Sequence, residues 1–126
     1  MRFLHAMIRV KDLEKSLEFY ENLLNMKLVK TKRLDDCELY YLEDEEHVAQ
    51  IELTVNDSIP ENGYTNGDAF GHFAFSVDSM DSFTEKMNKL GYKYLWEPYT
   101  IFSGTKISFV KDPDGNEIEL IEKKHD

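Results

Sequence analysis

The sequence contains an internal duplication with an offset of 67 residues. His5 and Glu52 recur as His72 and Glu119, since 72 − 5 = 67 and 119 − 52 = 67. The surroundings repeat as well, because each Glu is the centre of an Ile-Glu-Leu tripeptide. At 126 residues the chain has the size of one ordinary domain. The repeat therefore predicts a domain that is built from two copies of one small module.

Each copy shows the same expected order of strand, helix, strand, strand, strand. Alternating apolar residues predict the strands. Asp12 can cap the first helix, and either Asp78 or Ser79 can cap the second. Asn25 and Gly91 can end the two helices. We expect strands at 2–10, 26–33, 37–43, 47–55, 72–77, 92–95, 104–110 and 116–122. We expect one helix after Asp12 and a second at 79–90. These elements predict module one at about 1–55, a linker at about 56–70, module two at about 71–122 and a frayed tail at 123–126.

The four repeated His and Glu side chains are expected to point away from the apolar faces of their strands. The residues beside each Glu are Ile and Leu, so each Glu lies on the opposite face of its strand. A single His or Glu on a strand is more often a hydrogen-bonded or solvated residue. Four at repeat-equivalent positions instead favour one divalent-metal site, formed by His5, Glu52, His72 and Glu119.

Composition excludes several classes of partner. The 25 acidic and 15 basic residues give a net charge of −10, which repels phosphate backbones and anionic lipid, so neither nucleic acid nor a membrane is an expected partner. No apolar run approaches the roughly 20 residues of a membrane span, and no signal peptide is evident. Cys37 is the single cysteine, which excludes an internal disulfide. Together these features predict a cytoplasmic location.

Four segments of the chain carry a family resemblance. They are Met-Arg-Phe-Leu-His-Ala-Met-Ile-Arg-Val-Lys-Asp-Leu (1–13) with Ser16, Phe19 and Tyr20; Ile51-Glu52-Leu53-Thr54 with Asn56; Gly71-His72 with 75–78; and 111–115 through 119–122. These segments resemble the glyoxalase I (lactoylglutathione lyase) family of the vicinal oxygen chelate superfamily. The resemblance covers essentially the whole chain.

The resemblance implies an α+β fold of two βαβββ modules and a homodimer in which each metal site draws on two chains. The implied ligands are His5, Glu52, His72 and Glu119, around nickel or cobalt, with zinc or manganese as alternatives. The implied enzyme is a carbon–sulfur lyase. It isomerises the hemithioacetal of methylglyoxal and a thiol, with glutathione the expected thiol, to the S-lactoyl thioester.

The resemblance also implies roles for single residues. Glu119 is the base that moves the proton between adjacent carbons, and Glu52 is the opposed carboxylate that could serve the other face. Arg9 and Asn56 match residues that hold the γ-glutamyl end of glutathione, although Arg9 could form a salt bridge and Asn56 a turn. Phe102 stands where glutathione-using relatives commonly carry Lys, which leaves the identity of the thiol open.

The same superfamily contains competing functions. A thiol transferase or an extradiol dioxygenase uses two His and one carboxylate, and a methylmalonyl-CoA epimerase-like isomerase commonly has Gln in place of Glu52. A metal-free small-molecule-binding member needs none of the four ligands. Trp96, Tyr99 and Phe102 are expected either to line the mouth of the active site or to form a satellite core cluster. His47 has no repeat partner and is expected to be solvated.

Overall fold

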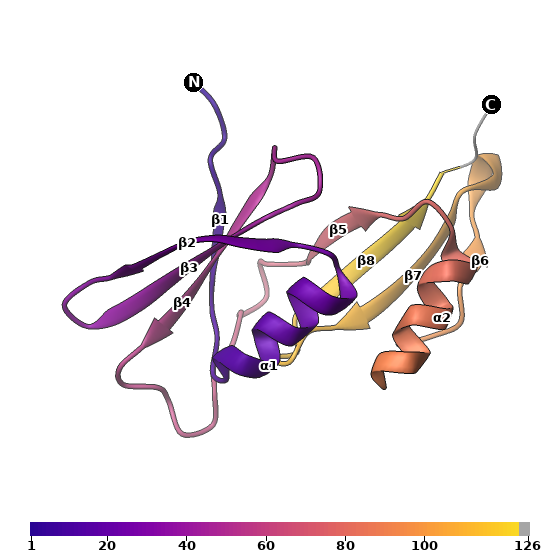
Figure 1. The fold of residues 1–126 in the computed structure, drawn as a ribbon. Helices are drawn as coiled ribbons and strands as arrows, with labels where there is room; N and C mark the ends of the chain where they lie inside the picture. The colour runs from indigo at the N-terminus through magenta and orange to yellow at the C-terminus, as the bar shows by residue number, and fades with distance from the viewer. Residues whose placement is uncertain (124–126) are drawn as a thin grey trace. The chain divides into compact units, whose positions relative to one another are not determined.

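The computed structural model describes residues 1–123, and the chain divides into two compact units, Met1–Thr65 and Asn66–Asp126 (Figure 1). The last three residues, which hold most of the expected frayed tail, lie outside the described residues. In chain order the elements are β1 (Ala6–Arg9), α1 (Leu13–Leu17), the π-helical turn η1 (Glu18–Leu23), β2 (Lys27–Arg33), β3 (Cys37–Glu43), β4 (Gln50–Asn56), β5 (His72–Ser76), α2 (Met80–Leu90), β6 (Tyr99–Thr100), the 3-10 turn η2 (Phe102–Gly104), β7 (Lys106–Lys111) and β8 (Glu117–Glu122).

Each unit contains one four-stranded sheet, and the two sheets have the same topology. The strand orders are β1-β4-β3-β2 and β5-β8-β7-β6, in which the first strand runs parallel to the last strand of its unit and the other pairs are antiparallel. The parallel pairings keep the offset of the repeat, because Ala6 pairs with Ile51 and Phe73 pairs with Ile118. The predicted α+β fold of two βαβββ modules is therefore confirmed.

The helix boundaries follow the predicted capping residues. Asp12 and Ser79 each accept a hydrogen bond from the backbone N–H three residues further on, at 3.1 Å. Asn25 (φ 57°) and Gly91 (φ 85°) adopt the left-handed conformation at the helix ends. The caps are 67 residues apart but the ends only 66 (91 − 25), so the first helix holds one extra residue, which the turn η1 accommodates. Among residues 1–123, no helix combines the length and apolar character needed to cross a bilayer.

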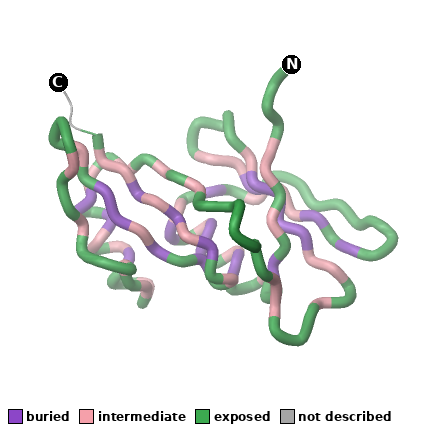
Figure 2. Tube along the Cα trace, turned by 180° about the vertical axis from the view of Figure 1, so that it is seen from behind, coloured by how far each residue is buried: buried purple, intermediate pink, exposed green. Residues whose placement is uncertain are grey.

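The cores lie between each helix and the apolar face of its sheet. On β3 and β4, Leu42 and Leu53 are fully buried and lie on the face opposite Glu52. On β8, Leu120 occupies the place that matches Leu53, and Ile118 on the same strand is also fully buried. The helices contribute Phe19, Tyr20, Leu23, Met80, Phe83 and Met87. Figure 2 shows buried positions concentrated on the helices and strands, with exposed positions on the loops. The other face of each sheet is thereby left for polar side chains.

Three of the predicted strand boundaries were wrong. The first strand begins at Ala6 instead of residue 2, and the preceding Phe3 and Leu4 are exposed. The strand expected from residue 47 begins at Gln50, because the Asp44 carboxylate accepts hydrogen bonds from the backbone N–H groups of Val48 and Ala49 and extends the turn. The strand expected at 104–110 occupies Lys106–Lys111 after the short turn η2.

No strand forms at 92–95, which also corrects a prediction; β6 is the dipeptide Tyr99–Thr100 instead. Leu95 donates one backbone hydrogen bond to Phe109, at 2.8 Å. The Tyr94 hydroxyl lies 2.7 Å from the hydroxyl of Thr84 on α2. Tyr92 donates a second backbone hydrogen bond, to Met87 of α2, so this segment is held by isolated main-chain bonds and side-chain contacts without the ladder that defines a strand.

Replacement of Leu53 by Ala should lower the free energy of unfolding by about 2–5 kcal/mol, because a fully buried Leu leaves a cavity when it is shortened. The control is Val48→Ala at a position that is 76% exposed, where a change within about 0.5 kcal/mol is expected. Urea unfolding followed by circular dichroism measures both. Equal stability of the two variants would contradict a closely packed core at Leu53.

Candidate functional site

In the first unit, one His and one Glu meet on the sheet face that points away from the core. His5 directly precedes β1 and Glu52 is central in β4, and His5 Nε2 lies 2.7 Å from Glu52 Oε2. The Glu52 side chain is only 10% exposed, and its Oε1 accepts a hydrogen bond of 3.2 Å from Thr54 Oγ1. The carboxylate is therefore held between two polar neighbours, with neither Lys nor Arg as its partner in the described part of the chain.

Tyr41 is the third member of this group. It lies directly opposite Glu52 on the neighbouring strand β3 and packs edge-to-face on His5, with ring centroids 5.5 Å apart. Burial, the negative charge of Glu52 and a hydrogen bond to Glu52 raise the pKa of Tyr41. The phenol thus stays neutral at physiological pH and can donate a hydrogen bond to the carboxylate.

The second unit repeats this group with a more open arrangement. His72 begins β5, and its Nε2 lies 3.2 Å from Oε1 of Glu119 on β8. Phe109 lies opposite Glu119 and packs edge-to-face on His72, at 5.2 Å between centroids. The side chains of His72 and Glu119 are 41% and 18% exposed. We call these two groups the first and second half-sites.

The aromatic member of each half-site was missed in the sequence. Tyr41 and Phe109 are 68 residues apart (109 − 41), one more than the repeat offset, so a search at constant spacing does not match them. The signal that could have found them is the hairpin register. Each aromatic residue occupies the position across the antiparallel pair from its Glu.

The predicted substrate-binding residues have different surroundings. Arg9 is exposed on β1 and lies opposite Thr54, on the same face as Glu52. Within residues 1–123 no carboxylate pairs with Arg9, so the salt bridge considered for it does not form there. Asn56 ends β4, and its Nδ2 donates a hydrogen bond of 3.1 Å to the Tyr64 hydroxyl.

The three aromatic residues considered for the active-site mouth separate. Trp96 packs on Phe109, with centroids 5.1 Å apart, and so extends the second half-site. Tyr99 lies in the edge strand β6 and is about half exposed, and Phe102 is 81% exposed. Only Trp96 of the three contacts a half-site residue through an aromatic pair within the described chain.

His47 and the single cysteine, Cys37, lie outside the half-sites. His47 is exposed, and its Nδ1 lies 2.6 Å from Glu43 Oε1 in the turn before β4. Burial and the neighbouring Asp36 raise the pKa of the Cys37 thiol. A protonated, buried thiol is a poor nucleophile, so Cys37 has no catalytic character.

Each half-site holds fewer donor atoms than a divalent metal usually binds in a protein. Among residues 1–123, no group of three or more His, Cys, Asp or Glu side chains gathers in one place. Each half-site supplies one imidazole nitrogen and one carboxylate oxygen. Protein metal centres commonly use three or four protein ligands, so one half-site alone does not supply a complete set.

Comparisons with known proteins agree with the duplicated fold. A sequence profile of the Glyoxalase/Bleomycin resistance protein/Dioxygenase superfamily matches residues 2–120. The lactoylglutathione lyase of Salmonella typhimurium is 42% identical over 131 aligned residues, which cover 98% of this chain and 94% of the relative. The lactoylglutathione lyase of Haemophilus influenzae is 40% identical over 129 residues, with the same coverage.

Solved structures give the same family. Glyoxalase I from Zea mays superposes with a TM-score of 0.85 at 32% identity over 98% of this chain, which spans only 45% of the maize chain. The trypanothione-dependent glyoxalase I of Leishmania major superposes with a TM-score of 0.80 at 34% identity. The match covers 98% of this chain and 87% of the Leishmania chain.

Trp96 is the single tryptophan of the chain and therefore reports on the second half-site. Replacement of Phe109 by Ala removes the ring on which Trp96 packs, so its fluorescence emission should move to longer wavelength and acrylamide should quench it more strongly. Phe102→Ala, at an exposed position, should leave both unchanged. Identical spectra for the Phe109 variant and the wild type would contradict this contact.

Proposed function

We propose, because this chain belongs to the Glyoxalase/Bleomycin resistance protein/Dioxygenase superfamily, that it acts as a metal-dependent lactoylglutathione lyase. It would isomerise the hemithioacetal of methylglyoxal and a thiol, with glutathione the expected thiol, to the S-lactoyl thioester. The observation that carries this proposal is the pair of matched His–Glu half-sites at an offset of 67 residues. Relatives that are 40–42% identical over nearly the whole chain bear this activity as their name.

The reaction requires a proton to move between adjacent carbons of the hemithioacetal. A carboxylate beside those carbons can take the proton from one and return it to the other. A bound divalent ion supplies Lewis-acid stabilisation of the negative charge that develops on the substrate oxygens. The chain must therefore provide both a set of ligands and one carboxylate that is free to accept a proton.

The surroundings of the two glutamates support different roles for them. Glu52 is almost buried and is fixed by Thr54 and Tyr41, which suits a ligand whose position stays constant. Glu119 is more exposed and lies beside the apolar ring of Phe109. A carboxylate with fewer fixed partners is freer to turn toward a substrate carbon, as a general base must. We therefore assign the catalytic base to Glu119, with Glu52 as the opposed carboxylate.

The ligands that we propose for the metal are His5, Glu52, His72 and Glu119. Two imidazoles and two carboxylates without a thiolate suit six-coordinate ions, so we favour nickel or cobalt, with zinc and manganese as alternatives. Two carboxylates also distinguish this set from the two His and one carboxylate of a thiol transferase or extradiol dioxygenase. We assign Arg9 and Asn56 to the binding of the thiol portion, and we place the enzyme in the cytoplasm.

Glu119→Gln separates the base from the ligands. The amide oxygen still coordinates weakly but cannot accept the proton, so turnover should fall by at least about 10²-fold while most of the metal is retained. His5→Ala and His72→Ala should lose metal and turnover together. Metal content by mass spectrometry and thioester formation after reconstitution with nickel, cobalt, manganese or zinc measure the two properties.

The assignment of the base is contradicted if the Glu119→Gln enzyme turns over at the wild-type rate with metal bound. Glu52→Gln would then be the next variant to test. If the metal-free wild-type protein gains no isomerase activity with any of the four ions and with several thiols, the proposed function itself is wrong.

We further propose a homodimer with two sites, each built from His5 and Glu52 of one chain and His72 and Glu119 of its partner. Cyclic dimers are the commonest closed oligomers. Each half-site alone has only one His and one Glu, fewer ligands than a metal centre commonly uses. Light scattering after size exclusion should give twice the mass of 14.8 kDa. An active monomer would contradict the shared arrangement.

A further inference from the structure

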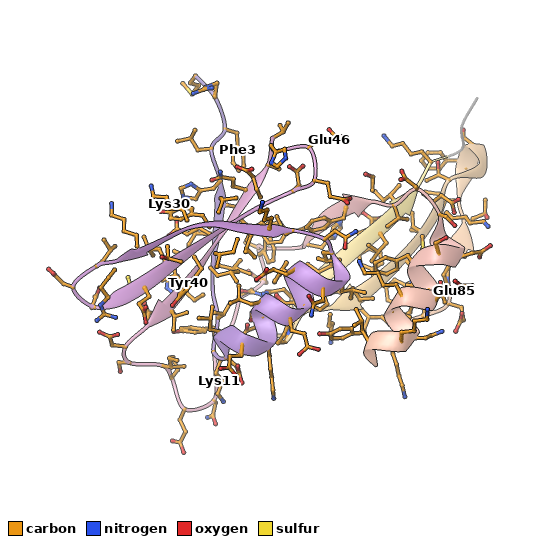
Figure 3. All side chains as sticks on the ribbon, viewed as in Figure 1. Phe3, Lys11, Lys30, Tyr40, Glu46 and Glu85 are labelled. Atoms are coloured by element: carbon orange, nitrogen blue, oxygen red, sulfur yellow. The ribbon has the colours of Figure 1, made fainter. Side chains whose placement is uncertain are left out.

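The sheet face that carries the first half-site also carries a group of exposed cations, Arg9, Lys30 and Lys32, which we call the cationic strip. Lys30 on β2 lies opposite Tyr41, which in turn lies opposite Glu52. Because directly opposed residues share a sheet face, Lys30 belongs to the face of Glu52. Figure 3 draws Lys30 and Tyr40 on opposite sides of the sheet, as this register requires.

The second row of this face contains the other two cations. Lys32 lies opposite Leu39, Leu39 opposite Thr54, and Thr54 opposite Arg9. Lys30 and Lys32 are two residues apart, about 7 Å along the strand. Three strand spacings separate Lys32 from Arg9, about 14 Å between backbones. The cationic strip thus has positive charge at both edges of the sheet, with the first half-site between them.

Within residues 1–123, no acidic side chain forms an ion pair with the cationic strip. The other two cations of β2 have acidic neighbours, because Arg33 pairs with Asp57 and Lys27 lies opposite Glu43. Lys30 instead lies over the ring of Tyr41, with Nζ 5.3 Å from the centroid. Among residues 1–123, none of the three strip cations has an ion-pair partner, in a chain with 25 acidic residues.

Lysines on an edge strand can also prevent pairing with another sheet, a role that the self-association of a variant measures. The duplicated module shows whether the sheet itself needs cations at these places. Ser76 replaces Arg9 at the offset of 67, and Tyr99 on edge strand β6 stands where Lys32 stands on β2. The contact that Lys30 makes with Tyr41 is made in the second unit by Trp96 with Phe109. The same fold is therefore built without cations at these places.

We infer that Lys30 and Lys32 form a carboxylate-binding subsite for the thiol co-substrate, at the opposite edge of the sheet from Arg9. The inference rests on the proposed function and narrows its substrate to thiols with two separated carboxylates. A tripeptide thiol such as glutathione spans about 10 Å when extended and carries a carboxylate near each end. Flexible Arg and Lys side chains at the two edges can meet both ends while the sulfur lies near Glu52.

The test uses the double variant Lys30→Gln/Lys32→Gln and the unreactive probe S-methylglutathione. Calorimetry should show about tenfold weaker binding of the probe than in the wild type, as expected for the loss of two charged contacts. Rising salt should weaken binding to the wild type more than binding to the variant. The matched control Lys15→Gln/Lys89→Gln removes the same charge from exposed helix positions and should bind as the wild type does.

Kinetics give the second measurement, on nickel-loaded enzyme with methylglyoxal. The KM for the glutathione hemithioacetal should rise about tenfold with kcat almost unchanged, and the KM for the 2-mercaptoethanol hemithioacetal should stay constant. Equal probe affinity in variant and wild type overturns the inference, as does an increase in self-association as the only change. An inactive wild type whose probe binding still depends on the two lysines refutes the proposed function alone and supports the subsite.

Discussion

Parallel pairing of the first and last strands of each unit is the constraint on which the half-sites depend. The pairing of Ala6 with Ile51 brings His5 next to Glu52, although 47 residues separate them in the chain. The equivalent pairing of Phe73 with Ile118 does the same for His72 and Glu119. A parallel connection needs a crossover, and the helix supplies it while covering the apolar face. One topological element therefore positions the polar pair and completes the core.

The two half-sites share geometry but differ chemically in their surroundings. Around Glu52 the sheet face carries hydroxyls and cations, whereas around Glu119 it carries Phe109 and Trp96. This divergence changes the free energy of unfolding little, because exposed positions on that face of each sheet contribute little to either core. Two glutamates with different surroundings thus arise from copies of the same Ile-Glu-Leu strand.

Much of the fold could be predicted from the sequence because its signals are local and repeated. These signals depend on residues that are near neighbours in the sequence. They are the alternation of apolar residues along the strands, the helix caps at Asp12 and Ser79, and the helix ends at Asn25 and Gly91. The missing strand at 92–95 could not be foreseen, because Tyr94 contacts α2 and so competes with sheet pairing. Tyr41 and Phe109 could be found only from the hairpin register. Their separation is one residue longer than the repeat offset, so a search at constant spacing does not match them.

The π-helical turn η1 has a consequence for how the two copies could diverge. One residue added to a regular helix rotates everything that follows by about 100° around the axis and would turn the next strand away from its partner. The wider turn at Glu18–Leu23 absorbs the added residue locally, so β2 still enters the sheet beside β3. Changes of length in the crossover are thereby uncoupled from the strand pairing that joins His5 to Glu52. A module of this kind can accept an inserted residue in its helix while the register of its strands, and so the His–Glu contact on its sheet, is unchanged.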